Sequence, residues 1–450
     1  MAPSPPVTGD MKVPLMKLNR MPDVIVLGFA FFFVFTGLSA CVKMASTILP
    51  PSQVAFPELG SLYLSFAFFA LFGAAPIVDK IGVRPAMFFA SLTYCAFAFA
   101  NVGALIHSGD ANTQLGILLP SAILIGFGAS ILWASEGTYL MRCATKQTIG
   151  RYSGVFFAIY CGSAAFSPLF TALMLQANVD KITAFGLLGG FSVLGSCILI
   201  YIWSRPDPSN PDVEPTSQSE KSKTPLFLQS AQIIFSPKML LVSVLVYFYT
   251  WEFAFINACI PLFIKTSDST LDLRNKLYLS ALFGVVIIFT CLFIGKITDR
   301  VQSPWKMMLG NSVIYLTCFL AMGLHPDPMN NYPLLCCVNI LWAIAEAVTV
   351  NQLYKIIGGL FAANPTAYSS FKFHQSLGQS IAYFSSGRML TAEKIPDVKI
   401  WMPLLGGFMV VACICTWIVT KDISWAPPSG KKDTVVLDEV KEGDSLMTAK

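Results

Sequence analysis

Twelve long apolar segments constrain the fold of this chain more than any other feature of its sequence. Each is close to the roughly 20 residues that an α-helix needs to cross the hydrocarbon core of a bilayer. A helix satisfies its own backbone hydrogen bonds, and these segments are too long for the strands of a membrane barrel. The segments cover residues 24–44, 57–78, 85–107, 115–139, 152–175, 183–204, 238–264, 277–297, 306–324, 332–354, 367–387 and 400–420.

The composition agrees with a membrane protein. The 450 residues are 55% apolar and only 12% charged, and the mean hydropathy of +0.64 lies outside the range of soluble globular domains. The first apolar segment begins only at Val24 and is too long for a cleaved signal peptide, so we expect it to be the first spanning helix. The sequence therefore predicts an all-α polytopic membrane protein, with the lipid bilayer as its first partner.

A weak internal repeat divides the chain into two related parts. Residues 126–162 hold an apolar helix, a glutamate, a basic turn and a second apolar helix, and residues 342–378 carry a weaker copy. The matching pairs are Tyr139 and Tyr354, Tyr152 and Tyr368, Phe157 and Phe373, and Gly162 and Gly378. A period of about half the chain length predicts two pseudo-symmetric halves of six helices each.

Polar segments set the domain boundaries. Residues 205–237 open with a stretch rich in Pro and Ser that has no apolar face to bury, which is typical of a linker. We predict a cytosolic N-terminal segment at 1–23, an N-terminal half at 24–204, a cytosolic linker at 205–237, a C-terminal half at 238–420 and a cytosolic tail at 421–450.

The distribution of basic residues predicts the orientation in the membrane. Most of the 30 lysines and arginines lie on the side that holds the N-terminus, the even-numbered connections and the tail, and such an excess marks the cytosolic side. The net charge of +5 is therefore a topology signal, and we expect no nucleic-acid partner. In the tail, Glu442 precedes Leu446 and Met447 as in an acidic dileucine sorting signal. Both the plasma membrane and an endolysosomal membrane remain open as locations.

Two tight turns, after the second and eighth apolar segments, carry an acidic residue next to basic ones. Such groups cap helix ends and pair with charges on a neighbouring helix. Glu136 lies near the same end of the fourth segment, where Lys80 or Arg84 is its expected partner. We predict a conformational latch formed by Asp79, Lys80, Arg84, Glu136, Arg142, Asp299 and Arg300.

These turns, the six-plus-six arrangement and the polar middle loop resemble the major facilitator superfamily. More specifically, residues 132–140 (LWASEGTYL) and 152–157 (YSGVFF), with Asn351-Gln352 and 376–378, resemble its uncoordinated-ninety-three branch. The superfamily resemblance implies a transporter whose halves alternate access to a central cavity. The branch resemblance implies a second function class, because some members regulate an ion channel or escort other membrane proteins. The chain departs from the branch at Glu136 and Tyr160, where glutamines are usual, and at 167–168, where Ser-Pro replaces a Gly-Asn pair.

Two carboxylates at membrane depth are the strongest candidates for a functional site. Glu252 lies about midway along the seventh apolar segment, and Glu346 about midway along the tenth, with Asn339 and Trp342 on the same helical face. An ionisable side chain at this depth is costly, so it usually faces a cavity or a partner. One hypothesis is that the two acids bind a cation or carry a coupling proton. The alternative is that each is hydrogen-bonded to a neighbouring helix and fixes packing.

Three further polar residues lie in the tenth and eleventh segments. Asn351, Gln352 and His374 either line the cavity or form interhelical hydrogen bonds, and packing is the favoured interpretation. Lys372 is expected to reach the membrane interface with its ammonium group.

The predicted function is secondary transport of a small solute of unknown identity. Coupling of that transport to protons is part of this hypothesis. Acidic residues without a base at the same depth favour a cationic or neutral solute. The alternative is a non-transporting subunit or escort with a membrane-protein partner. We expect no enzyme activity and no cofactor, because the sequence shows no catalytic triad, metal-ligand spacing or phosphate-binding loop.

Overall fold

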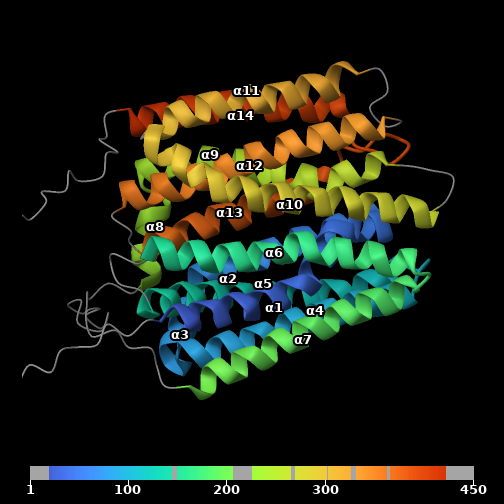
Figure 1. Ribbon diagram of the computed structural model, residues 1–450, viewed down its shortest axis with the longest axis horizontal. Coiled ribbons are helices and arrows are strands. Elements are labelled where there is room, and N and C mark those ends of the chain that lie inside the picture. The colour runs from blue at the N-terminus through green and yellow to red at the C-terminus, as the bar shows by residue number, and fades with distance from the viewer. Residues whose placement is uncertain are drawn as a thin grey trace, which may run out of the picture.

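The computed structural model describes residues 20–143, 149–205, 226–264, 269–301, 303–325, 331–361 and 365–421. Within these ranges the chain forms a bundle of long helices that lie roughly side by side (Figure 1). Residues 1–19 of the N-terminal segment, 206–225 of the linker and 422–450 of the tail, which include the sorting motif, lie outside the described residues.

In its described residues the N-terminal half forms seven α-helices for six predicted spans. The second span is divided, because a π-helical turn η1 (Pro51–Ala55) precedes α2 and a break at Gly73 separates α2 from α3. The helices are α1 (Met21–Ile48), α2 (Phe56–Phe72), α3 (Ala74–Ile81), α4 (Val83–Ile106), α5 (Ala111–Cys143), α6 (Ile149–Gln176) and α7 (Lys181–Ser204).

The C-terminal half follows a short helix in the predicted linker, α8 (Leu226–Ile234), which sequence reasoning did not anticipate. Its first span ends in a π-helical turn η3 (Phe255–Cys259) and a 3₁₀ turn η4 (Ile260–Phe263). The spanning helices are α9 (Pro237–Ala254), α10 (Ser269–Val301), α11 (Pro304–Leu324), α12 (Tyr332–Leu360), α13 (Pro365–Ser386) and α14 (Val398–Thr420).

Several of these helices are preceded by an Asp, Ser or Asn whose side chain caps the helix N-terminus. Asp180 precedes α7, and its carboxylate accepts a hydrogen bond from the Thr183 amide at 2.9 Å. The Thr183 hydroxyl also donates to this carboxylate. Both hydrogen bonds lower the pKa of Asp180, and the side-chain bond has the larger effect. Ser236, Asn331 and Asp397 cap α9, α12 and α14 in the same way.

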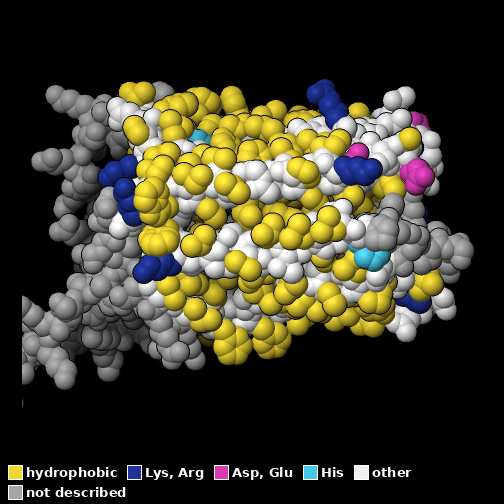
Figure 2. All heavy atoms as spheres, turned by 90° about the horizontal axis from the view of Figure 1, so that it is seen from above, with side chains coloured by type: hydrophobic (Ala, Val, Ile, Leu, Met, Phe, Trp, Pro, Cys, Tyr) yellow, Lys and Arg dark blue, Asp and Glu magenta, His cyan; other side chains and the backbone are white. Residues whose placement is uncertain are grey.

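Eleven helices in the described part of the chain are long and apolar enough to cross a membrane. The eleventh predicted span is α13, which has 22 residues but is more polar than the others. Figure 2 shows one face on which hydrophobic side chains cover the middle of the molecule, while charged side chains gather toward its two ends. This distribution matches a bilayer with polar boundaries.

Each half has its own hydrophobic core. We call the end of the bundle at which α1 begins and α14 ends the terminal end, and the opposite end the far end. The core of the C-terminal half also includes Val42, Leu49, Phe56 and Leu59, which lie at the far end of α1 and α2. The two halves are therefore packed together at the far end in this conformation.

The short helix α8 docks on the C-terminal half through its backbone. Ser370 of α13 donates its hydroxyl to the Ser230 carbonyl at 3.3 Å, and the Nε2 atom of His374 bonds the Ile234 carbonyl at 3.2 Å. The linker is thus held against α13 at the terminal end before α9 begins (Figure 1).

Close helix contact in the N-terminal half depends on Gly126 in α5. A Cβ atom at this position would lie 2.4 Å from the Leu62 carbonyl oxygen and 2.6 Å from the Ser65 Cβ atom of α2. Both helices would have to separate, since these are backbone and short side-chain atoms. Small residues are what allows such close packing in membranes.

We predict that Gly126→Ala lowers the free energy of unfolding by about 1–3 kcal/mol, the usual cost of overpacking. Gly116→Ala in the same helix is the matched control, because a Cβ there meets no atom within 4 Å. The control is expected to be neutral or slightly stabilising, since Ala is the better helix former. Thermal unfolding of the purified proteins in detergent compares the two. Equal midpoints would contradict the role of Gly126.

Candidate functional site

Glu252 is completely buried near the end of α9, where donors from the same half hold both of its oxygens. The Tyr315 hydroxyl of α11 donates to Oε1 at 2.9 Å, and the indole N–H of Trp342 in α12 donates to Oε2. Tyr315 also lies 3.1 Å from the Thr349 hydroxyl, which extends the network along α12. These contacts match the alternative in which Glu252 is hydrogen-bonded to neighbouring helices and fixes packing, and they tie α9, α11 and α12 together.

Glu346 lies one helical turn from Trp342 on α12 and is only 5% exposed. Its Oε2 atom has no hydrogen-bond partner among the described residues. The charges of Glu346 and Glu252 act on each other. The C-terminal half thus holds two interacting carboxylates in its interior, of which one is fully hydrogen-bonded and the other is not.

Lys43 of α1 brings a positive charge from the opposite half to this region. It is 8% exposed, its charge interacts with that of Glu346, and no direct salt bridge joins the two side chains among the described residues. The first apolar segment, predicted as 24–44, would put Lys43 at a helix end, but α1 continues to Ile48. The expectation of a cationic or neutral solute depended on the absence of a base at this depth, and Lys43 removes that premise.

A proline in α6 explains where the Lys43 amine lies. Pro168 has no N–H, so the carbonyl of Ala164, four residues earlier, lacks its helical donor. Lys43 donates to that carbonyl at 2.9 Å. The free carbonyl therefore positions the amine.

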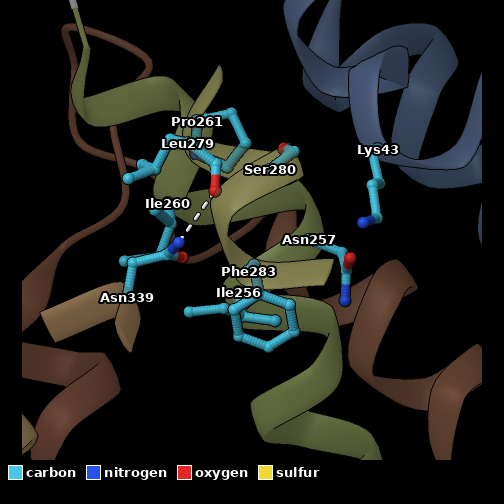
Figure 3. Close-up of a pocket in the computed structure, with 9 residues that line it drawn as sticks. All are labelled: Lys43, Ile256, Asn257, Ile260, Pro261, Leu279, Ser280, Phe283 and Asn339. Atoms are coloured by element: carbon cyan, nitrogen blue, oxygen red, sulfur yellow. Dashed lines mark hydrogen bonds between the residues drawn. The ribbon is translucent and has the colours of Figure 1, made fainter. Parts of the chain in front are cut away.

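A small pocket lies between the halves beside Lys43 (Figure 3). Asn257 of η3, Ser280 of α10 and Asn339 of α12 supply its other polar walls, and Ile256 and Phe283 are among its apolar ones. Asn339, predicted as a site residue, donates its amide to the Leu279 carbonyl at 2.8 Å. The π-helical turn η3 presents Asn257 here, in keeping with the frequent occurrence of such turns at functional positions.

The other predicted polar residues of α12 and α13 lie toward the terminal end. Thr298 of α10 donates to Asn351 at 3.0 Å and accepts from Gln352 at 3.0 Å, which forms an interhelical network. His374 lies between the Tyr247 hydroxyl, at 3.1 Å, and the Ile234 carbonyl. These contacts match the packing interpretation, and the structure does not bring these residues to the Lys43 pocket.

Glu136 faces a cation that sequence reasoning did not assign to it. The charge that acts on this buried carboxylate belongs to Lys372 of α13, rather than to Lys80 or Arg84. The Lys372 amine lies 4.9 Å from the ring centre of Trp133, one helical turn from Glu136. The expectation that Lys372 reaches the membrane interface was wrong, because its amine lies between the two halves.

The remaining predicted latch residues are spread over the terminal end. Asp79 and Lys80 are exposed in α3, and Arg84 donates to the Trp203 carbonyl at 3.4 Å and to the Arg205 carbonyl at the end of α7. Arg142 is half-buried near the end of α5. The side chains of Asp299 and Arg300 lie outside the described residues.

A fourth buried acid among the described residues, Glu58, is one that sequence analysis did not consider. Glu58 of α2 is completely buried, accepts from Asn101 of α4 at 3.2 Å, and leaves its Oε2 without a partner among the described residues. Glu58 lies within the second apolar segment of the sequence. An ionisable residue inside a predicted spanning helix is a candidate site residue, and that rule could have identified it.

Comparison with known proteins decides the family. A model of the Major Facilitator Superfamily matches residues 24–383. The chain belongs to the major facilitator superfamily. The prediction of an all-α fold of the major facilitator type is confirmed, and the protein is a transporter-like multi-pass membrane protein.

Two groups of proteins are similar over most of the length. Protein unc-93 homolog A of Bos taurus is 22% identical over 84% of this chain and 90% of its own length. The UNC93-like protein MFSD11 of Xenopus tropicalis is 26% identical over 83% of this chain and 91% of its own length. These similarities confirm the resemblance to the uncoordinated-ninety-three branch.

Solved structures agree on the fold. A D-xylose-proton symporter superposes with a TM-score of 0.64 at 13% identity, covering 91% of this chain and 98% of its own. An auto-inhibited POT family peptide transporter gives a TM-score of 0.65 at 13% identity, covering 89% and 96%.

We predict that Tyr315→Phe destabilises the protein by about 1–3 kcal/mol, because it leaves a buried carboxylate oxygen of Glu252 without its donor. Tyr278→Phe is the matched control, since its hydroxyl donates to Gln176 at 2.6 Å at the surface. That variant is expected to stay within about 0.5 kcal/mol. Denaturant unfolding of both proteins tests the difference, and comparable losses would contradict it.

A double-mutant cycle tests the pair formed by Glu136 and Lys372. Glu136→Gln and Lys372→Gln are each expected to lower stability, and the double variant to lose less than their sum, with a coupling energy of about 0.5–3 kcal/mol. The unfolding midpoints of the four proteins provide the measurement. Effects that add within about 0.5 kcal/mol would show that the two charges do not interact.

Proposed function

We propose that this protein is a proton-coupled secondary transporter, which moves a small solute as its two halves alternate access to a site between them. The superfamily match and the transporter structures with the same fold support this proposal. The excess of basic residues on the side of both termini supports a cytosolic location for the terminal end.

One observation carries the proposal: two carboxyl groups of the C-terminal half and a lysine of the opposite half are buried in the interior. Glu252 and Glu346 act on each other, and Lys43 of the opposite half acts on Glu346. Holding two negative charges together in an apolar interior is costly, so a proton on one of them relieves the cost. Movement of the halves that separates Lys43 from Glu346 changes that balance, which couples proton binding to conformation.

The contacts at the two ends support alternating access. At the far end, the Ser46 hydroxyl donates to the Ala258 carbonyl at 2.5 Å, and the Ser380 hydroxyl donates to the Gly60 carbonyl at 2.9 Å. Both bonds join the two halves and close this end. We propose that the pair of Glu136 and Lys372 makes the corresponding connection at the terminal end.

The similar proteins support a second candidate function. The similar proteins carry the unc-93 name, and the branch resemblance implies a regulatory subunit of an ion channel or an escort for other membrane proteins. That function does not require interacting carboxylates in the interior. A membrane protein that co-purifies at fixed stoichiometry, together with absence of transport, would favour it.

The test of proton coupling replaces the carboxylates individually. A thermal-shift screen of the purified protein identifies a solute, since a ligand that binds the folded state raises its stability. In proteoliposomes we expect Glu252→Gln and Glu346→Gln to abolish accumulation of that solute under an inward proton gradient. Exchange of the solute at equal pH is expected to persist, because exchange moves no net proton.

Glu393→Gln serves as the control, because Glu393 is an exposed glutamate in the connection between α13 and α14. It is expected to accumulate solute as the unmodified protein does. Undiminished accumulation in both interior variants would remove the proposed proton site.

A further inference from the structure

Glu58 of α2 and Asn101 of α4 form a buried polar pair in the N-terminal half. The carboxyl group of Glu58 is completely buried, Asn101 is 1% exposed, and the Asn101 amide nitrogen donates to Oε1 of Glu58 at 3.2 Å. The same nitrogen donates to the Phe97 carbonyl at 3.1 Å, so both of its N–H donors are in use. The amide therefore has no further donor to give to the carboxyl group.

Two oxygen atoms of this pair lack a hydrogen bond. Oε2 of Glu58 and Oδ1 of Asn101 are both buried, and neither has a partner among the described residues. A carboxylate oxygen and an amide oxygen are both acceptors, so neither can satisfy the other while Glu58 is ionised. A proton on Oε2 would supply the donor that Oδ1 lacks and would complete a reciprocal acid–amide pair. One proton can thus remove two unsatisfied atoms.

No cation forms an ion pair with Glu58 in the described part of the chain. Lys43, the one cation of α1, donates instead to the Ala164 carbonyl of α6. The ionisable or amide side chains that the surrounding helices present at this level are Asn101 of α4, Cys41 of α1, Gln114 of α5 and Tyr383 of α13, and η1 presents no ionisable one. An ionised carboxylate in such surroundings is costly, because no opposite charge compensates it.

Another face of α2 forms part of the closed far end. Two residues after Glu58, the Gly60 carbonyl accepts from the Ser380 hydroxyl of α13 at 2.9 Å. One turn further on, the ring of Tyr63 stacks on that of Tyr383 with their centres 5.6 Å apart. The same two turns of α2 therefore carry Glu58 and the contacts with α13, which lies beside α2 (Figure 1).

The C-terminal half also covers the turn of α2 that carries the acid. Phe56 and Leu59, on either side of Glu58 in the sequence, belong to the hydrophobic core of the C-terminal half. Separation of the halves at the far end would uncover this turn and admit water to it. The environment of Glu58 thus depends on whether the far end is closed.

We propose that Glu58 holds a proton while the far end is closed and releases it when the far end opens to water. A hydrated glutamate is ionised at neutral pH, whereas the closed end offers the proton an amide oxygen and offers the charge no cation. The closed conformation then binds one proton more than the open one, so acidity at the far end favours closure. This goes beyond the proposed function, because it assigns a proton to the N-terminal half, apart from Glu252 and Glu346, and requires no solute.

Infrared spectroscopy of the purified full-length protein in detergent at neutral pH tests for the proton. The carbonyl stretch of a protonated carboxyl group is separate from the stretches of a carboxylate. We expect the spectrum of the unmodified protein minus that of Glu58→Gln to contain the protonated-acid band. Glu393→Gln is the matched control, because the exposed carboxyl group of Glu393 should give carboxylate bands only. Carboxylate bands from Glu58 would overturn the proposal.

Hydrogen–deuterium exchange measures opening in peptides from the start of α2 and the end of α4. The unmodified protein and Glu58→Gln are compared at each pH, so that the pH dependence of the exchange chemistry itself cancels. Relative to Glu58→Gln, the opening equilibrium of the unmodified protein should increase by up to about tenfold per pH unit, the limit for release of one proton. The glutamine variant should stay protected, because a neutral amide of the same shape can keep both hydrogen bonds to Asn101.

Two results of the exchange experiment would contradict the proposal. The first is the same pH dependence in both proteins. The second is weaker protection of Glu58→Gln than of the unmodified protein at neutral pH, which would show that the folded state needs the charged carboxylate. Neither measurement uses a solute, so absence of transport would count against the proposed function and leave the proton at Glu58 in place.

Discussion

The cost of holding charge in an apolar interior governs the middle of this molecule. Two hydrogen-bond donors stabilise the Glu252 carboxylate. The Ala164 carbonyl and the charge of Glu346 stabilise the Lys43 amine. Glu346 is less completely compensated, because one of its oxygens lacks a partner in the described part of the chain. Groups of this kind are retained in membrane proteins mainly where solutes or ions pass.

The way the two halves are joined fits a bundle that changes conformation. Most of each hydrophobic core lies within one half, although Val42 and Leu49 of α1 and its following turn join the C-terminal core. The hydrogen bonds across the far end include two from serine hydroxyls to backbone carbonyls and one from the Tyr278 hydroxyl to Gln176. Such bonds are modest in free energy, each contributing about 0.5–1.5 kcal/mol. Opening the far end would therefore break these modest bonds and also expose the apolar side chains that the two halves share there.

The sequence allowed prediction of those features that follow from hydrophobic periodicity and from the position of a residue within an apolar segment. The apolar segments located the spans, and the spacing along one helix placed Asn339, Trp342 and Glu346 together. It could not identify partners that come from distant segments. Lys43 and Glu346, like Glu136 and Lys372, are brought together only when the halves pack, and no local pattern encodes that packing. The break at Gly73 and the docked helix α8 were likewise invisible to a search for long apolar segments.

The proline in α6 has a mechanical consequence. The Ala164 carbonyl that Pro168 leaves free lies where α6 meets α10, and a Cβ atom at Gly284 would be only 2.7 Å from it. One backbone oxygen thus holds the Lys43 amine and also forms part of the contact surface between the halves. Any sliding of α10 across α6 changes the surroundings of that oxygen. The position of the buried cation is therefore sensitive to relative motion of the two halves, even when no acidic side chain moves.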